Sequence, residues 1–186
     1  MRYILGLFIT IGLLIVLIVV LVSGGNGGSS KVPTTSKTLD SYASSQARVR
    51  MTVLGPIVAN KDHKGLRVTI DKDSATFEQL QNYDNRVVDS KSFDNSRLSY
   101  QSFLKALDKA GFTQGNVELK DADYRGFCPL GNTYIFELID GDKSIERFWS
   151  NSCGDPKTYY GNLSLTMELF ERQIPEFSQL ANQVHL

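Results

Sequence analysis

The stretch YIFELIDGDKSIERFW, residues 134–149, holds two apolar runs on either side of an Asp-Gly pair. Both runs are rich in aromatic and β-branched residues, as strands are, and Asp-Gly is a strong signal for a two-residue hairpin turn. With Asp140 and Gly141 as the two turn residues, Arg147 lies opposite Tyr134. The stretch therefore predicts an antiparallel hairpin.

The two cysteines of the chain, Cys128 and Cys153, flank this hairpin at equal distances from the predicted turn. In that register they face each other, which places their Cα atoms within the roughly 4.4–6.8 Å that a disulfide requires. A redox pair would favour a Cys-x-x-Cys spacing, and a zinc site would need His63 and the penultimate His185 as further ligands. We predict a Cys128–Cys153 disulfide, leave two free thiols as the alternative, and expect no metal or cofactor.

The single tryptophan, Trp149, falls on the same predicted face as Phe136 and Arg147. A tryptophan beside a disulfide usually packs into a core, so we assign Trp149 to the core. A charged side chain on that face is anomalous, which makes Arg147 a candidate contact residue. Tyr159 and Tyr160, in a loop after the hairpin, are the other candidates for exposed contact residues, with packing onto the core as the alternative that is common for loop aromatics.

Four further runs predict strands that precede the hairpin. Residues 48–53 and 66–71 alternate polar and apolar side chains, and the polar turn between them favours a second hairpin. Residues 76–80 and 86–90 are weaker strand candidates, separated by the turn-forming residues 82–85.

Two helical patterns complete the domain. The first follows a cap at Asp94 or Asn95 and stops at Gly111, and it has four apolar residues at helical spacing: Tyr100, Phe103, Leu104 and Leu107. The second begins at Ser164 and contains Pro175, which predicts a kink or two short helices. The predicted fold class is α+β, with an antiparallel sheet of about five or six strands and two helices on one face.

The N-terminus has the composition of a membrane anchor. Residues 3–22 carry no charge, and as a helix they would span roughly 30 Å, the thickness of a bilayer hydrocarbon core. We expect residues 1–22 to form an uncleaved transmembrane signal-anchor helix, residues 23–38 a flexible Gly/Ser-rich linker, and residues 39–186 an extracytoplasmic α+β domain. Cleavage after Ser23 is the alternative. Arg2 before the span and the predicted disulfide both favour a cell-membrane protein with its C-terminal domain outside.

The charge balance excludes one class of partner. The chain has 20 Lys and Arg against 20 Asp and Glu, so there is no basic excess to neutralise nucleic-acid phosphates. No nucleophile elbow, phosphate-binding glycine loop or zinc-protease motif occurs. We predict no nucleic-acid partner, a membrane contact through the anchor, and a protein or an envelope glycan as the partner of the domain.

Four short motifs carry a family resemblance: Cys128-Pro129-Leu130-Gly131, Arg147-Phe148-Trp149, Ser152-Cys153-Gly154 and Gln173-Ile174-Pro175. With the apolar N-terminus and the polar tether, they resemble single-span, membrane-anchored proteins of Saccharibacteria-type bacteria. The matching residues lie chiefly in the last third of the chain. The resemblance implies an extracytoplasmic compartment and carries no activity with it.

The sequence thus favours a non-enzymatic binding or interaction module tethered at the cell surface. A small envelope-associated hydrolase is the first alternative. It would need convergent carboxylates or a histidine; only His63 is well placed to serve, the Asp121/Asp123 pair is too short a cluster to count, and we assign no catalytic residue. His63 stands in a polar turn, where we expect it to be solvated. An accessory subunit of a membrane complex is the second alternative, because Gly6 and Thr10 form a small-x-x-x-small pair in the predicted span.

Overall fold

Six strands with alternating side chains form one antiparallel sheet. The computed structural model describes residues 38–119 and 123–186. The sheet order is β4-β3-β2-β1-β5-β6, and every neighbouring pair is antiparallel. The strands are β1 Ala47–Leu54, β2 Lys64–Ile70, β3 Ser74–Gln81, β4 Arg86–Asp94, β5 Thr133–Asp140 and β6 Lys143–Asn151. All of the predicted strands are therefore confirmed, and the α+β class with them.

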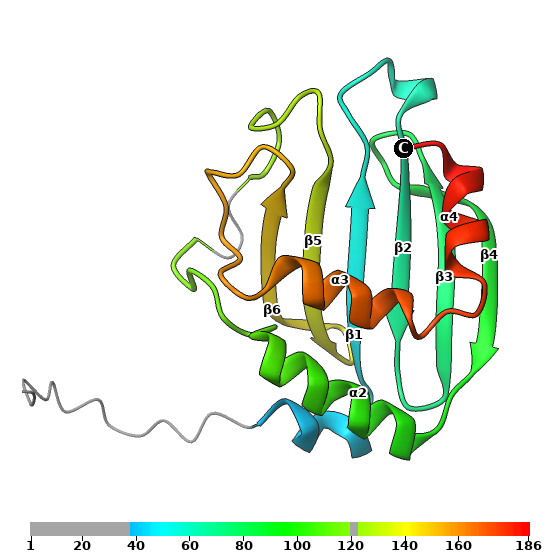
Figure 1. Cartoon of the computed structure of the whole chain (residues 1–186), viewed down its shortest axis with the longest axis vertical. Coiled ribbons are helices and arrows are strands. Elements are labelled where there is room, and N and C mark those ends of the chain that lie inside the picture. The colour runs from blue at the N-terminus through cyan, green and yellow to red at the C-terminus, as the bar shows by residue number, and fades with distance from the viewer. Residues whose placement is uncertain (1–37, 120–122) are drawn as a thin grey trace, which may run out of the picture. The chain divides into compact units, whose positions relative to one another are not determined.

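All the described α-helices cover one face of this sheet, as Figure 1 shows. They are α2 Arg97–Ala110, α3 Leu163–Glu171 and α4 Phe177–Val184, and two short 3-10 helices are η1 Leu39–Ser44 and η2 Asn60–Asp62. Apolar side chains of the strands meet those of the helices in one core, in which Val49, Met51, Tyr100, Leu104 and Phe170 are almost fully buried. Pro175 follows α3 and separates it from α4, which confirms the two short helices predicted there.

The helix caps differ by one or two residues from the prediction. The side chain of Ser96, not that of Asp94 or Asn95, accepts a hydrogen bond from Ser99 N at the start of α2. The two predicted residues are engaged elsewhere, because Asp94 is the last residue of β4 and Asn95 Nδ2 donates to the carbonyl of Asp71. Gly111 ends α2 at φ 78°, as predicted.

The second helical pattern also starts earlier than expected. Asn162, not Ser164, is the N-cap of α3, and its Oδ1 accepts from Leu165 N at 3.0 Å. Ser164 lies within the first turn of the helix. Asparagine and serine are comparable caps, so the pattern of residue types alone does not choose between them.

The β5–β6 hairpin is present, but its predicted register is wrong. Asp140 pairs with Lys143, so the turn residues are Gly141 and Asp142. Of these two, only Gly141 has a positive φ, 60°, as in a type II′ turn rather than the type I′ turn that Asp-Gly favours. A bulge at Leu138/Ile139 shifts the ladder by one further residue.

The corrected register changes the faces of the hairpin. Trp149 pairs with Ile135, and Arg147 pairs with Glu137 rather than with Tyr134. Side chains alternate along a strand, so Trp149 and Arg147 lie on the face opposite to Phe136, away from the helices. Trp149 is buried, as predicted, but it belongs to a second apolar cluster on that face.

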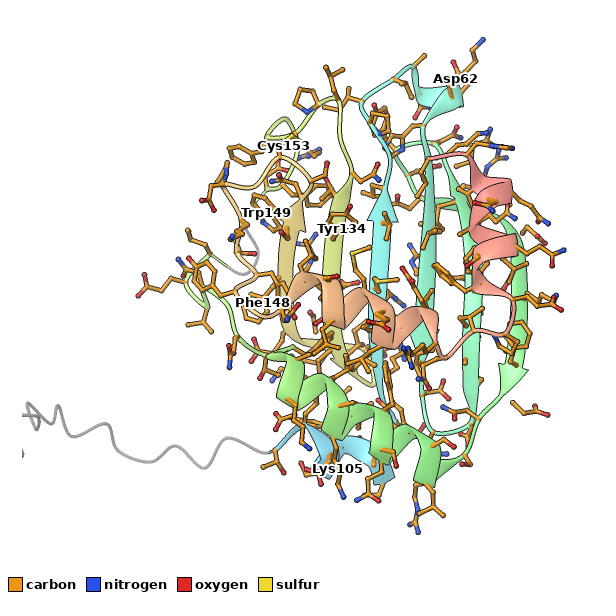
Figure 2. The ribbon with its side chains drawn as sticks, viewed as in Figure 1. Asp62, Lys105, Tyr134, Phe148, Trp149 and Cys153 are labelled. Atoms are coloured by element: carbon orange, nitrogen blue, oxygen red, sulfur yellow. A yellow bond between two sulfur atoms is a disulfide. The ribbon has the colours of Figure 1, made fainter. Side chains whose placement is uncertain are left out.

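The Cys128–Cys153 disulfide is confirmed, with 5.8 Å between the two Cα atoms. The two cysteines are not partners in the ladder, because Cys128 precedes β5 and Cys153 follows β6. In Figure 2, Cys153 lies beyond the end of the strand that carries Trp149. The disulfide packs directly against Gly131. A Cβ added to Gly131 would overlap Ser152 Oγ and lie 2.5 Å from Cys128 Sγ. A glycine is therefore required beside the disulfide.

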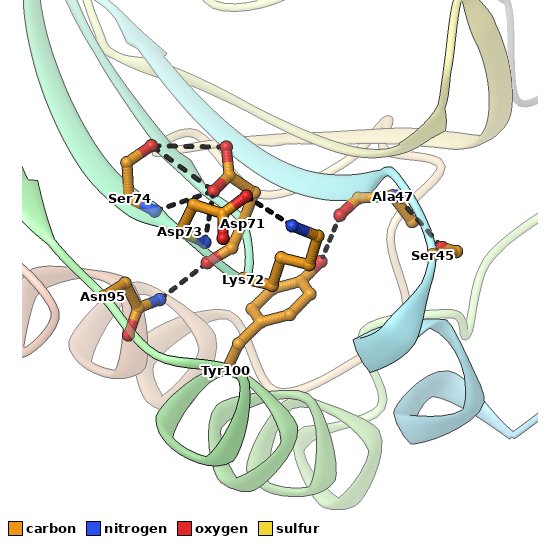
Figure 3. A network of polar contacts seen from close by, with 8 residues as sticks. All are labelled: Ser45, Ala47, Asp71, Lys72, Asp73, Ser74, Asn95 and Tyr100. Carbon is orange, nitrogen blue, oxygen red and sulfur yellow. Dashed lines mark hydrogen bonds and ion pairs between the residues drawn. The ribbon is translucent and has the colours of Figure 1, made fainter.

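Polar contacts hold the β2–β3 turn to Asn95, just before α2, and hold α2 itself to β1 (Figure 3). Asp71 Oδ1 accepts from the amides of Asp73 and Ser74 at 2.8 and 2.7 Å, which closes the turn. The hydroxyl of Tyr100 in α2 donates to the carbonyl of Ala47 in β1 at 3.0 Å. Burial raises the pKa of Tyr100, so the hydroxyl stays protonated as this donor.

The predicted transmembrane segment and linker, residues 1–22 and 23–38, lie outside the described residues except for residue 38. Within residues 38–119 and 123–186, no helix has both the length and the hydropathy needed to cross a membrane.

Replacing both cysteines by serine, Cys128→Ser with Cys153→Ser, is expected to lower the free energy of unfolding. The disulfide closes a loop across 25 positions, for which the chain-entropy model gives about 3.5 kcal/mol at 25 °C as an upper value. Urea unfolding followed by circular dichroism measures the loss. A reducing agent should destabilise the native protein to the same level and leave the double variant unchanged; a variant as stable as the native protein contradicts this prediction.

Tyr100→Phe is expected to lower the free energy of unfolding by about 1–2 kcal/mol, because it leaves the buried carbonyl of Ala47 without its donor. Tyr160→Phe is the matched control, since Tyr160 is 58% exposed. Chemical denaturation of the two variants measures the difference, and equal stability of both would count against a structural role for the Tyr100 hydroxyl.

Candidate functional site

The sheet face turned away from the helices, which we call the open face, carries a row of charged side chains. Glu137 of β5 is the cross-strand partner of Arg50 in β1 and of Arg147 in β6. Glu137 Oε2 lies 3.6 Å from Arg50 Nη1, and Glu137 Oε1 lies 3.7 Å from Arg147 Nε. The Glu137 carboxylate thus forms ion pairs with two guanidinium groups. Burial lowers the pKa of Arg50, and the negative charge of Glu137 opposes that change.

A second row on the open face continues the pattern. Arg67 of β2 and Glu78 of β3 face each other, with 3.3 Å between Nη1 and Oε2. The Nε of Arg67 is buried and has no hydrogen-bond partner among the described residues. The open face therefore holds more arginine than acid along its middle strands.

An apolar cluster occupies the open face at the end of the sheet where β1 and β6 finish. Leu54, Leu80, Ile135 and Trp149 form it, with Tyr124 packed against them. Phe127 stacks on Trp149 with ring centroids 5.5 Å apart and planes 13° apart. Since Tyr124 and Phe127 belong to the connection before β5, this connection covers part of the open face.

A cleft of about 670 Å³ lies beside this cluster, and its size is within the range of small-molecule sites. Loops from three separate connections form its walls: the β1–β2 connection, the β3–β4 turn and the segment that precedes β5. Its lining includes Leu54, Ile57, His63, Tyr83, Tyr124 and Arg147, together with polar groups such as Asn85 and Asp123. Rings and apolar groups thus make most of the surface, and a few polar groups converge on it.

One wall of the cleft is a stacked pair of rings, His63 and Tyr83, with centroids 4.0 Å apart. The Tyr83 hydroxyl donates to the carbonyl of Val58 at 2.9 Å and accepts from its amide at 3.1 Å. These bonds tie the β3–β4 turn to the β1–β2 connection. His63 is only 4% exposed, so the expectation of a solvated side chain is wrong, because Tyr83 covers the imidazole.

Arg147 projects into the cleft from β6. Its guanidinium carbon lies 5.5 Å from the centroid of the Tyr124 ring, a cation–π arrangement that fixes the side chain. Among the described residues, the acid that it meets is Glu137 at 3.7 Å, which is longer than a hydrogen bond. Asp123 is a second acid within electrostatic reach of Arg147. No hydrogen bond from the Arg147 guanidinium occurs among the described residues, so its N–H donors can still bind a carboxylate in the cleft, in competition with these two acids.

Asp123 and Arg125 form an exposed ion pair at the cleft mouth. Arg125 Nε donates to Asp123 Oδ1 at 2.8 Å, and Arg125 Nη2 donates to Oδ2 at 2.7 Å. The side-chain hydrogen bonds from Arg125 are the largest cause that lowers the pKa of Asp123 from 3.8 to about 2. At neutral pH the Asp123 carboxylate is ionised, and both of its oxygens already accept hydrogen bonds from Arg125.

The structure brings some of the predicted site residues together and separates others. Arg147, His63 and Asp123 line the same cleft, while Asp121 lies outside the described residues. Tyr159 is only 2% exposed, and its hydroxyl is hydrogen-bonded to Thr166 Oγ1 at 2.6 Å. The expectation of an exposed Tyr159 is therefore wrong, whereas Tyr160 is exposed and stays a prediction as a contact residue.

Sequence reasoning missed Tyr83 and Tyr124 as lining residues. Tyr83 was visible only as part of a turn, and its contact with His63 joins residues of different strand connections. A tyrosine within a four-residue polar turn, 82–85, was the one signal that could have pointed to it.

Comparison with known proteins adds no functional assignment: no protein-family model matches the chain, and no curated protein matches it either. Within the described residues, no group of three or more His, Cys, Asp or Glu side chains is placed to hold a metal ion.

Arg125→Gln is expected to raise the pKa of the Asp123 carboxyl from about 2 towards 3.8, because it removes the hydrogen bonds that favour the ionised form. The folded-state pKa is depressed, so the stabilisation from this pair is complete above about pH 4 and is lost as the pH falls through about 2. Carboxyl ¹³C NMR titration of the native protein and of Arg125→Gln measures the two Asp123 pKa values. An Asp123 pKa that is the same in both proteins would contradict the assignment.

Proposed function

We propose that the domain is a non-enzymatic binding module whose ligand is a carboxylate-bearing sugar of the cell envelope. The observation that carries the proposal is the cleft of about 670 Å³ with Tyr83 and Tyr124 in its walls and Arg147 projecting into it. Tyrosine rings offer flat faces to a pyranose, and a guanidinium binds a carboxylate through paired hydrogen bonds. The predicted membrane anchor and tether would hold this cleft at the outer surface of the cell.

The scaffold favours a rigid recognition site. Arg147 lies on a strand, and the Tyr83 ring is held by the hydrogen bonds between its hydroxyl and the backbone of Val58. The disulfide secures the connection that carries Tyr124, since Cys128 follows it closely and itself lines the cleft. A site fixed in this way loses little conformational entropy when a ligand binds.

A hydrolase is the second candidate, because His63 and Asp123 line the same cleft. The chemistry favours binding over hydrolysis. With a pKa of about 2, Asp123 is too weak a base to accept a proton at neutral pH. His63 is stacked against Tyr83, and its Nδ1 lies 3.4 Å from the carbonyl of Asn82, which limits its access to a substrate.

The full chain in detergent micelles should bind N-acetylmuramic acid more tightly than N-acetylglucosamine, which lacks the lactyl carboxylate. Charge-assisted hydrogen bonds contribute roughly 1.5–3 kcal/mol, so we expect a difference of about tenfold or more in the dissociation constant. Calorimetry measures the affinities. Trp149, the single tryptophan, packs in the same cluster as the cleft residue Tyr124, so its fluorescence gives a second readout.

Arg147→Gln should abolish the preference for the acidic sugar. Arg172→Gln is the matched control, because Arg172 pairs with Glu168 in α3 and takes no part in the cleft. Equal affinity for the two sugars, or an unchanged preference in Arg147→Gln, would overturn the proposal. Turnover of a glycan that is lost in His63→Ala would instead favour the hydrolase.

A further inference from the structure

The two edges of the sheet differ in how they are covered. At the β6 edge, the amides of Thr158 and Tyr159 both donate to the carbonyl of Trp149 at 2.9 Å, so a following segment covers the end of that strand. At the β4 edge, β3 is the only strand among the described residues that pairs with β4. Figure 1 shows β4 at the outer limit of the sheet with its far side open. An uncovered edge of this length is a template for another strand.

Every residue of β4 is exposed except Phe93, which is half-buried. Its sequence RVVDSKSFD places Asp89 and Lys91 on either side of Ser90. Asp89 and Lys91 pair with Gln79 and Phe77 of β3 and project towards the helix side, whereas Ser90 pairs with Glu78 and projects to the open face. The strand therefore has opposite charges at equal distances from one central serine.

This arrangement is self-complementary about a two-fold axis at Ser90. In an antiparallel pair, facing residues project to the same face of the sheet, so the axis must pass through a residue rather than between two. An axis at Ser90 sets Asp89 of each copy against Lys91 of the other. An axis at Asp89 would instead set two aspartates against each other, and an axis at Lys91 two lysines, both of which are destabilising.

We propose that two copies of this chain associate through antiparallel pairing of their β4 strands, centred on Ser90. The pairing joins two six-stranded sheets into one continuous sheet, with the helices of both copies on the same face. Asp89 of each copy forms an ion pair with Lys91 of the other on that face. The interface is isologous and closed, as a two-fold dimer requires.

The surroundings of β4 accommodate this partner. Val87 and Val88, exposed by 42% and 51%, lie at the bulge in the β3–β4 ladder and would be covered at both ends of the pairing. Lys91 lies 3.9 Å from Glu176 of its own copy, so a second acid from the partner completes its environment. Asp89 Oδ1 accepts from the Ser90 amide, and this local bond has to open for the Ser90 backbone to pair.

Cysteine cross-linking of the full chain in detergent micelles or reconstituted vesicles tests the pairing. Both native cysteines are in the disulfide, so Ser90→Cys adds the only free thiol. In the proposed dimer the two Cα atoms at position 90 lie about 4.5–5.5 Å apart, within disulfide range. Oxidised glutathione should therefore yield a covalent dimer on a non-reducing gel.

Ser92→Cys is the matched control, because it lies on the same strand and face and is also exposed. Two residues at position 92 would be displaced by about 13 Å along the strand, beyond the reach of a disulfide. We expect Ser90→Cys to cross-link at least about tenfold faster than Ser92→Cys. Equal rates for the two variants, or no dimer from Ser90→Cys, would overturn the proposal.

Charge reversal tests the register independently of the thiol position. Lys91→Glu in the Ser90→Cys background sets two acids against each other and should slow cross-linking by about tenfold. Adding Asp89→Lys restores opposite charges at the same sites and should restore the rate. A double reversal as slow as the single one would exclude the Asp89–Lys91 pair, and thermal unfolding of each variant checks that the fold is kept.

Discussion

The alternation of side chains along β1 is the constraint on which the rest of this structure depends. β1 is hydrogen-bonded on both sides, to β2 and to β5, so its register is shared by both halves of the sheet. Val49 and Met51 are fully buried on the helix side, while Arg50 faces the open side. A slip of one residue would bury arginine under the helices and expose the core residues, at a cost of several kcal/mol. That penalty fixes which face of the sheet is open, and with it the side on which Leu54 of β1 lines the cleft.

The elements could be predicted from the sequence because each carries a local signal. Period-two alternation gave the strands, Gly111 gave the end of α2, and Pro175 gave the break between α3 and α4. The β5–β6 register could not be predicted in this way. Both Asp140-Gly141 and Gly141-Asp142 place glycine where a two-residue turn accepts it, and the bulge at Leu138 leaves no mark in the sequence. The faces of Trp149 and Arg147 follow from that register, so they were predicted wrongly together.

The candidate site was less predictable than the fold, because its residues meet only through tertiary contacts. His63 is buried by a tyrosine from another connection, and Arg147 is held by the ring of Tyr124. Tyr159 looked exposed because it follows a polar loop, yet it packs under α3 through its bond to Thr166. In each case the deciding partner is another segment, which local pattern does not identify. The disulfide was predicted correctly although the register used to infer it was wrong, because both cysteines flank one hairpin.

The segment that carries Thr158 and Tyr159 has a consequence for how far sheets of this protein can grow. A sheet with two open edges can add neighbours without limit, which is the geometry of fibrils. Here the amides of Thr158 and Tyr159 bond to the carbonyl of Trp149 near the end of β6, so a strand of another copy cannot pair with β6 at that residue. The same short segment that completes the core around Tyr159 thereby protects the end of the β6 edge from pairing with another sheet.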